Sequence, residues 1–296
     1  MPWYFFVLIS SALFAMNNMI EKHIVDKRID KPMTLTIVGC FLSGLIGLIL
    51  FILFPVSRYI SIDQGLLLLL SGALGVFYLV FYYKALKLED ASLVIPLFKF
   101  EYVFVFVLGA IFLKEYLVLK QIIGLIIIII SSLFLGCKNI KTLLKPRKSF
   151  WLMALASLMI VISTIAFKGV TKNYNFLTGM VYSLLGGGLM GVVLLCVPRY
   201  RKNVMKINYK SIGPILLLDD VIDIVARFCS RYAIILTTVT YVYILSSVQS
   251  FFVLIYGVIL TLLFPKIIKE DISQMAIANK IIVGLVMFIG MWLVYF

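Results

Sequence analysis

The sequence has few of the residues from which catalytic and metal sites are built. Histidine occurs once among the 296 residues, as His23, and cysteine occurs four times. The cysteines stand at unrelated spacings, which favours neither a zinc site nor a set of disulfides. They are Cys40, Cys137, Cys196 and Cys229. Since an active site needs a nucleophile beside a base or a cluster of metal ligands, we expect no enzymatic activity, no bound metal and no cofactor.

Charge is scarce as well, and this places the chain in a membrane. Charged residues are 14% of the sequence, hydrophobic residues 63%, and the mean hydropathy is +1.13, whereas soluble domains have about 25% charged residues. A transmembrane helix needs about 20 apolar residues, so the apolar runs predict an all-α membrane protein with ten transmembrane helices. The expected ranges are 3–23, 33–55, 65–86, 91–113, 119–136, 150–171, 176–197, 211–234, 236–264 and 279–296. The first run has no preceding basic segment and no cleavage site, so we expect it to remain as a helix.

Acidic residues are outnumbered by basic ones, 13 to 27, for a net charge of +14. In a membrane protein such an excess reports loop orientation, so we expect no nucleic-acid partner. The basic residues gather after the first, fifth and seventh predicted helices, around residues 22–31, 138–148 and 199–210. Because cytoplasmic loops are the basic ones, we predict that these loops are cytoplasmic and that both termini lie outside. The expected location is the plasma membrane of a prokaryotic cell.

The order of features in the first half of the chain recurs in the second half. Tyr83-Lys84-Ala85-Leu86, Glu101, Lys114-Glu115 and Gly124 correspond in order to Arg231-Tyr232-Ala233-Ile234, Gln249, Lys269-Glu270 and Gly284. Two copies of a unit with an odd number of spans insert in opposite orientations, as in the inverted repeats of many secondary transporters. The predicted units are residues 1–136 and 150–296, joined by a basic linker at 137–149.

The eighth predicted helix contains charges where a membrane helix should have none. Asp219, Asp220 and Asp223 stand near its middle, followed by Arg227. A charge facing lipid there costs about 2.5 to 3.5 kcal/mol, so we expect these side chains to face the interior of the bundle. Asp223 and Arg227 form either a buried ion pair that only holds the helix in place or part of a site. One arginine does not neutralise three acids, so we predict that Asp219 or Asp220 contacts substrate or a coupling proton.

Proton coupling has two candidates in this helix, Asp220 and Asp223. Carboxylates that are buried close together do not both ionise cheaply, so one of them is expected to carry a proton. Uncoupled exchange stays open as an alternative.

The fourth predicted helix has a second pair of charges, Lys99 and Glu101. Two positions apart on a helix, they point in nearly opposite directions. We assign Glu101 to the cavity because Gln249 occupies its place in the second unit; alternatively, Lys99 pairs with an aspartate of the eighth helix and both charges are structural. The full set of predicted substrate-binding residues is Asn17, Tyr82, Lys99, Glu101, Asp219, Asp220, Asp223, Arg227, Tyr241 and Gln249.

Small residues and charge-free runs predict how the helices pack. Gly72 and Gly75 in the third helix and Gly186, Gly187 and Gly188 in the seventh predict close helix contacts. The fifth and tenth helices have no charge in the middle of the membrane, so we expect them at the periphery, facing lipid or forming a homodimer.

Motifs in the first unit are similar to those of a known family. Along the chain they read Tyr82-Tyr83-Lys84-Ala85-Leu86, Ala91-Ser92-Leu93-Val94-Ile95-Pro96, Phe112-Leu113-Lys114-Glu115 and Gln121-Ile122-Ile123-Gly124. These segments resemble the repeat of the EamA-type transporters in the drug/metabolite transporter superfamily. The resemblance implies two inverted five-helix repeats around a central cavity, with the fifth and tenth helices outside. Lys114 departs from the family pattern, which usually has glycine before the glutamate.

Together these features predict a secondary transporter, an exporter or exchanger of a small polar or zwitterionic metabolite such as an amino acid, that works by alternating access. Arg227 and Arg231 would suit a carboxylate or phosphate, and the acids would suit an amine. Two alternatives remain. One is a flippase of a lipid-linked or amphipathic substrate, and the other is an organic-cation transporter, because aromatic side chains beside carboxylates bind cations.

Overall fold

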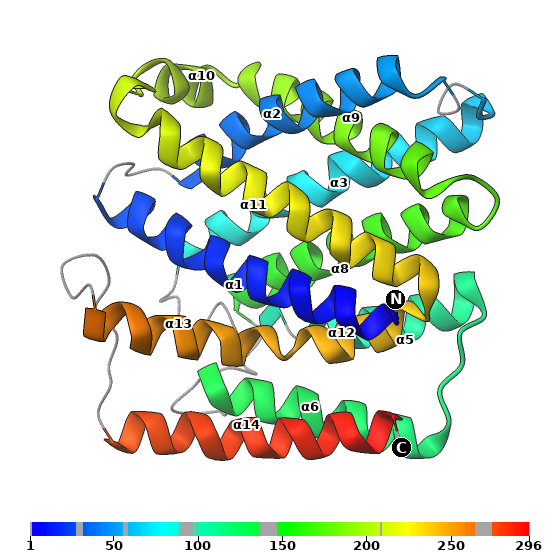
Figure 1. The fold of residues 1–296 in the computed structure, drawn as a ribbon, viewed down its shortest axis with the longest axis vertical. Helices are drawn as coiled ribbons and strands as arrows, with labels where there is room; N and C mark the ends of the chain where they lie inside the picture. Colours follow the sequence, from blue (N-terminus) through cyan, green and yellow to red (C-terminus); the bar gives the residue numbers. More distant parts are fainter. Residues whose placement is uncertain are drawn as a thin grey trace.

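The computed structural model describes residues 2–27, 32–55, 59–88, 97–98, 100–136, 147–207, 209–263 and 274–295, and the regular elements in these ranges are helices. In the first half they are α1 (Trp3–Lys27), α2 (Pro32–Leu53), α3 (Ile62–Leu86), α5 (Phe100–Leu108), the π-helical turn η3 (Gly109–Leu113) and α6 (Leu119–Gly136). In the second half they are α8 (Lys148–Thr171), α9 (Phe176–Leu195), α10 (Pro198–Met205), α11 (Tyr209–Leu236), α12 (Val239–Ser246), α13 (Gln249–Leu263) and α14 (Gln274–Tyr295). The long helices lie side by side across the view in Figure 1.

The helices of the described part are those of a polytopic membrane protein. Six segments are long and apolar enough to cross a membrane: Trp3–Glu21, Met33–Leu53, Ile62–Ala85, Lys148–Thr171, Phe176–Leu195 and Val239–Leu263. Helix α11 has 28 residues, but its charged side chains lower its hydropathy. The arrangement as ten helices in two inverted repeats stays a prediction, as do the unit boundaries. Most of the predicted linker, residues 137–146, lies outside the described residues.

Two elements differ from the sequence prediction. The basic segment after the seventh predicted helix contains a further helix, α10, which begins with Pro198 in its first turn. Proline is favoured there because its fixed φ suits a helix and its missing N–H leaves no bond unmade. The ninth predicted helix is divided into α12 and α13, with a turn at Ser247 and Val248 between them.

Helices α6 and α14 pack against each other at the edge of the bundle (Figure 1). Their contact is apolar, with Leu125 and Ile128 of α6 against Met287, Met291 and Val294 of α14. Large side chains on both helices stay exposed, among them Ile126 and Phe288. This confirms the peripheral position expected from the lack of charge. The homodimer through these helices stays a prediction.

Helix α11 separates its charged residues from its lipid-facing residues. Leu217, Leu218, Val221 and Val225 are between 43% and 58% exposed, whereas Asp219 is 3% exposed. The exposed residues recur at helical spacing and form one apolar face. As the sequence predicted, the acidic residues of this helix face the interior of the bundle.

Glycines bring α3 and α9 into backbone contact. A β carbon on Gly72 of α3 would collide with the backbone of Ser183, and one on Gly186 of α9 would collide with the backbone of Leu69. The same helix α9 meets α2 where Gly188 lies against Gly44. These contacts confirm the predicted role of the glycines in close packing.

Candidate functional site

Four carboxylates from α1 and α11 form an acid cluster, which we define as Glu21, Asp219, Asp220 and Asp223. Glu21 interacts electrostatically with the three aspartates, and the aspartates interact with one another. Helices α1 and α11 lie next to each other along their length (Figure 1), and this packing brings Glu21 to the acids of α11. The cluster therefore joins the first half of the chain to the second.

The sequence analysis missed Glu21, because it ended the first helix at residue 23 and left this acid at the end. In the structure α1 continues to Lys27, so Glu21 lies more than one turn inside the helix. Asn17 stands four residues before it on the same helical face. The Asn17 side chain donates a hydrogen bond to the Glu21 carboxylate. This spacing of four was the signal in the sequence that could have identified the pair.

Arg227 is the cation nearest to the acid cluster among the described residues. It forms an ion pair with Asp223, one turn earlier on α11, and a second hydrogen bond at 3.2 Å from its Nη2 to Ser43 Oγ of α2. Both side chains of the pair are about 30% exposed. Glu21, Asp219 and Asp220 have no ion-pair partner in the described part of the chain. The cluster thus has more carboxyl groups than cations to pair with them among the described residues.

Two acceptor atoms at the cluster have no donor. Asn17 is 5% exposed and Asp219 is 3% exposed, and the Oδ1 atoms of both have no hydrogen-bond partner among the described residues. An unsatisfied buried acceptor costs about 1 to 3 kcal/mol. These two atoms are therefore places where a bound molecule would find unmet hydrogen-bonding capacity.

Three tyrosines of α3 lie close to Glu21. Tyr78, Tyr82 and Tyr83 each interact electrostatically with Glu21. The ring of Tyr82 also packs against Tyr83 and Phe98, with centroids 5.2 and 4.9 Å away. The acid cluster thus lies between α1 and α11, with aromatic side chains of α3 close by.

Helix α2 approaches the cluster closely at a glycine. The Asp220 carboxylate lies against Gly39, where a β carbon would collide with Asp220 Oδ1. Arg227, Asp220 and Asp223 also interact electrostatically with Cys40, the residue after this glycine. Helix α2 therefore contributes backbone, Cys40 and Ser43 to the same region.

The structure places Tyr241 away from this cluster. Tyr241 accepts a hydrogen bond from Gln121 and its ring packs on Trp3 and Tyr295. Because Trp3 is 18 residues before Glu21 on α1, this position lies about 27 Å along the helix from the cluster.

Glu101 and Gln249 belong to helices α5 and α13. Glu101, in the first turn of α5, interacts with Tyr243, which hydrogen-bonds Thr164 of α8 at 2.9 Å. Gln249 is the first residue of α13. Lys99 lies outside the described residues.

Arg231 has a different set of contacts from Arg227. Its guanidinium donates to Ser71 Oγ of α3 at 3.4 Å and to Ser163 Oγ of α8 at 3.3 Å, and it lies 4.2 Å from the centre of the Phe167 ring. Ser71 and Ser163 each donate to the other's backbone carbonyl at 2.6 Å. Arg231 therefore links α11 to the crossing of α3 and α8.

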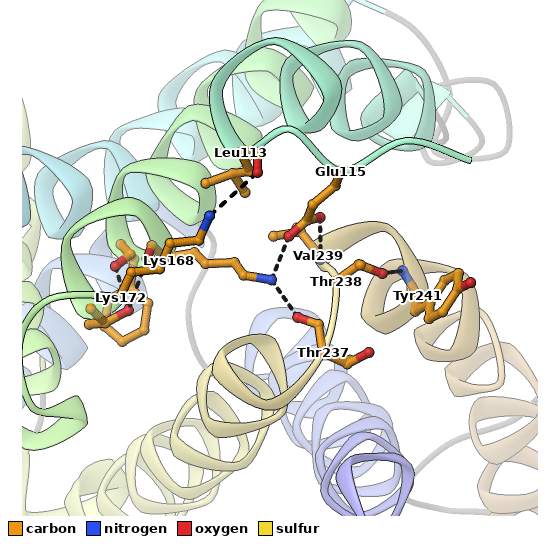
Figure 2. Close-up of polar contacts among 10 residues, drawn as sticks. Leu113, Glu115, Lys168, Lys172, Thr237, Thr238, Val239 and Tyr241 are labelled. Carbon is orange, nitrogen blue, oxygen red and sulfur yellow. Dashed lines mark hydrogen bonds and ion pairs between the residues drawn. The ribbon is translucent and has the colours of Figure 1, made fainter. Parts of the chain in front are cut away.

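A second polar arrangement, the Glu115 junction, consists of Glu115, Lys168, Thr237 and Val239 (Figure 2). Lys168 Nζ lies 2.5 Å from Glu115 Oε1 and also donates to the carbonyl of Thr237. The N–H of Val239 donates to Glu115 Oε2 at 2.8 Å. The side chains of both Glu115 and Lys168 are 9% exposed. The carboxylate thus holds Lys168 of α8 and caps the N-terminus of α12, where the helix dipole favours negative charge.

Lys114 gives the chain the turn that directs Glu115 into this junction. It is the residue after η3, with φ 57° and ψ 36° in the left-handed region, and its side chain is exposed. Glycine adopts this conformation without steric penalty, so the glycine that the family usually has here meets a backbone requirement. Lys114 adopts the same left-handed conformation, but its β carbon makes that backbone conformation strained.

We expect Lys114→Gly to raise the free energy of unfolding by about 1 kcal/mol. A non-glycine residue in the left-handed region is destabilised by roughly 1 to 2 kcal/mol. Glycine removes this penalty, but it also makes the unfolded chain more flexible, which offsets part of the gain. Thermal unfolding in detergent measures the change. Lys114→Ala is the matched control, since it removes the charge but keeps the β carbon, and it should unfold at the temperature of the parent. A Gly variant that unfolds at or below that temperature would contradict the strain.

The geometry offers no metal site in the described residues, since no group of three His, Cys, Asp or Glu side chains there could hold an ion. In contrast, the two polar arrangements both join the first half of the chain to the second inside an apolar bundle. Buried ionisable groups of this kind are typical of transport pathways.

Comparisons with known proteins agree with this picture. A solved structure, described as "Crystal structure of protein", aligns with 99% of this chain and 95% of its own chain, at 13% sequence identity and a TM-score of 0.62, which shows a shared fold. No curated protein sequence matches the chain. Residues 1–137 match the model of the EamA-like transporter family. This match confirms the resemblance found in the sequence motifs, and it shows that the first 137 residues are similar to EamA-like transporters.

Proposed function

We propose that the protein is a secondary transporter that moves a small polar or zwitterionic metabolite outward, or exchanges it, by alternating access of the two repeats. The observation that carries this proposal is the acid cluster, in which Glu21 of the first repeat meets Asp219 and Asp220 of the second. Inverted-repeat transporters bind their substrates at the interface between the repeats, near the middle of the membrane.

In this mechanism the Glu115 junction would be a contact between the repeats that closes one end of the transport pathway. It ties Glu115 of the first repeat to Lys168 and Thr237 of the second. Alternating access requires contacts between the repeats that form at one end and break when that end opens. The junction lies at the end of the bundle away from the basic helix α10 (Figure 1), so with cytoplasmic basic loops it would close the outer side.

Proton coupling is part of the proposal through Asp220 and Asp223. Asp220 lies within electrostatic reach of Asp223 and Glu21, and Arg227 is already paired with Asp223. An acid in such a group exchanges a proton when a charged substrate enters or leaves. We further propose that the protein resides in the plasma membrane of a prokaryotic cell.

The test is uptake into proteoliposomes with and without a pH gradient. Amino acids, organic cations and phosphorylated metabolites are first screened by thermal shift, and each hit is then followed as a labelled substrate. We expect uptake that responds to the gradient and falls about 10- to 100-fold in Asp220→Asn and Asp223→Asn, the effect of losing a hydrogen bond to a charged group. Asp63→Asn is the matched control, because Asp63 is exposed at the start of α3 and contacts only Ser61 and Gln64.

Each other outcome has a definite meaning. Uptake that both aspartate variants retain would remove the acids from the transport mechanism. Absence of uptake for every soluble compound, together with movement of a labelled lipid-linked substrate between leaflets, would replace the proposal with the flippase.

A further inference from the structure

We propose that the substrate of this transporter carries a protonated amine, and that the amine binds between Asn17 and Glu21 of α1 and Asp219 of α11. The inference rests on the proposed function and narrows it to a class of head group. It excludes substrates whose only charged group is a carboxylate or a phosphate.

The balance of charge is the first argument. The acid cluster has four carboxylates, and Arg227 is committed to Asp223 and Ser43. In surroundings of low dielectric constant like charges repel strongly, and buried charges require partners. Glu21, Asp219 and Asp220 have no ion pair in the described ranges. A ligand that adds positive charge lowers the energy of this group, whereas an anion raises it.

The unmet hydrogen bonds are a second, independent argument. Asn17 Oδ1 and Asp219 Oδ1 are buried acceptors without a donor in the described part of the chain. Both atoms need an N–H or O–H group. An ammonium group has up to three donors and no acceptor, so it satisfies these atoms and neutralises charge at once. A carboxylate or phosphate is an acceptor and satisfies neither of these two atoms; the buried donor that it could satisfy is Arg227 Nε.

The three tyrosines of α3 near Glu21 are consistent with the same ligand. Tyr78, Tyr82 and Tyr83 lie within electrostatic reach of Glu21. The faces of aromatic rings attract cations, more strongly when water is excluded. An amine between Glu21 and these rings would contact negative charge from both the carboxylate and the π-systems.

The contacts of Arg227 leave open whether the substrate also carries a carboxylate. Arg227 is paired with Asp223, but its Nε is a buried donor without an acceptor among the described residues, so a carboxylate of the substrate would also find a donor here. Amino acids and simple amine cations share the ammonium group, so both belong to the proposed class, and the experiment must separate them.

The test compares head groups on one side chain, using the purified full-length protein in detergent. Leucinamide has a free amine and no carboxylate, leucine has both, 4-methylpentanoate has only the carboxylate, and N-acetyl-leucinamide has neither charge. The same four head groups on phenylalanine and valine side chains make the result independent of side-chain size. Isothermal titration calorimetry gives each dissociation constant. We expect the free amine to bind at least about tenfold more tightly than its N-acetyl analogue, since acetylation removes the charge-assisted hydrogen bonds.

Variants locate the binding. Glu21→Gln, Asp219→Asn and Asn17→Leu should each weaken amine binding about 10-fold or more, whereas the exposed Asp63→Asn should bind as the parent does. The head-group comparison uses the unaltered protein, so it decides the question even where a variant fails to fold. Equal affinity for the free and acetylated amines, or preference for 4-methylpentanoate, would overturn the inference. So would unchanged amine binding in all three well-folded variants.

The same data separate this inference from the proposed transport. Amines that bind with the expected preference but do not cross proteoliposomes support the amine site and remove the transport proposal. A transported compound that lacks an amine, and whose uptake amines do not inhibit, leaves transport in place and overturns the amine site.

Discussion

Replacing Lys168 with methionine is expected to lower the free energy of unfolding by about 3 to 5 kcal/mol, the usual effect of removing one partner from a buried ion pair. Lys168 is 9% exposed at its side chain and donates to both Glu115 and the Thr237 carbonyl. Methionine has similar length and fills the same space, so the loss would come from the uncompensated Glu115 carboxylate. A reversible unfolding titration in mixed detergent and SDS micelles measures the change.

A double-mutant cycle shows whether the two charges act on each other. In Glu115→Gln the amide oxygen still accepts from the Val239 N–H, but Lys168 is left as a buried charge. With both substitutions no charge remains, so we expect the double variant to be more stable than the sum of the single effects by at least about 1.5 kcal/mol. Lys172→Met is the matched control, because Lys172 is exposed, donates to the Leu113 carbonyl at 3.4 Å and acts on the junction only through repulsion of Lys168. Additive effects in the cycle would show that the pair is not coupled.

The Glu115 junction also shows what a sequence cannot reveal about a membrane protein. Glu115 and Lys168 are 53 residues apart, and no spacing rule connects a loop residue to a residue on a later helix. The repeat comparison marked Glu115 as a recurring feature without indicating its partner. Their pairing depends on how α8 packs beside the segment that follows η3, which is decided by tertiary contacts.

The acids of α11 were predictable for the opposite reason. The penalty for exposing a charge to lipid acts on each residue separately, so the interior orientation of Asp219 and Asp220 follows from the sequence alone. Their neighbour Glu21 was missed because the end of a helix is the least certain feature of an apolar run. The two tyrosines predicted to bind substrate also differ in their positions. Tyr82 lies near the acids, whereas Tyr241 takes part in a ring cluster with Trp3 and Tyr295, and nothing in their local sequence distinguishes them.

The crossing of α3 and α9 allows a prediction of similar size to that for Lys168. In Gly72→Ala the new methyl group would meet the Ser183 backbone, and in Gly186→Ala it would meet the Leu69 backbone. A backbone cannot move aside as a side chain can, so the helices must separate and lose contact along their length. We expect each substitution to lower the free energy of unfolding by about 2 to 3 kcal/mol.

The combination of these two substitutions distinguishes helix separation from local strain. Once the first methyl group has moved α3 away from α9, the second is accommodated at little extra loss, so the double variant should be clearly less destabilised than the sum of the single variants. Gly169→Ala is the matched control on α8. Its β carbon would meet nothing within 4 Å, and alanine is favoured over glycine in a helix by about 1 kcal/mol, so this variant should be as stable as the parent or more stable. Unfolding titrations of the four variants under the same conditions test this directly, and Gly72→Ala or Gly186→Ala at parental stability would show that the two helices do not depend on backbone contact.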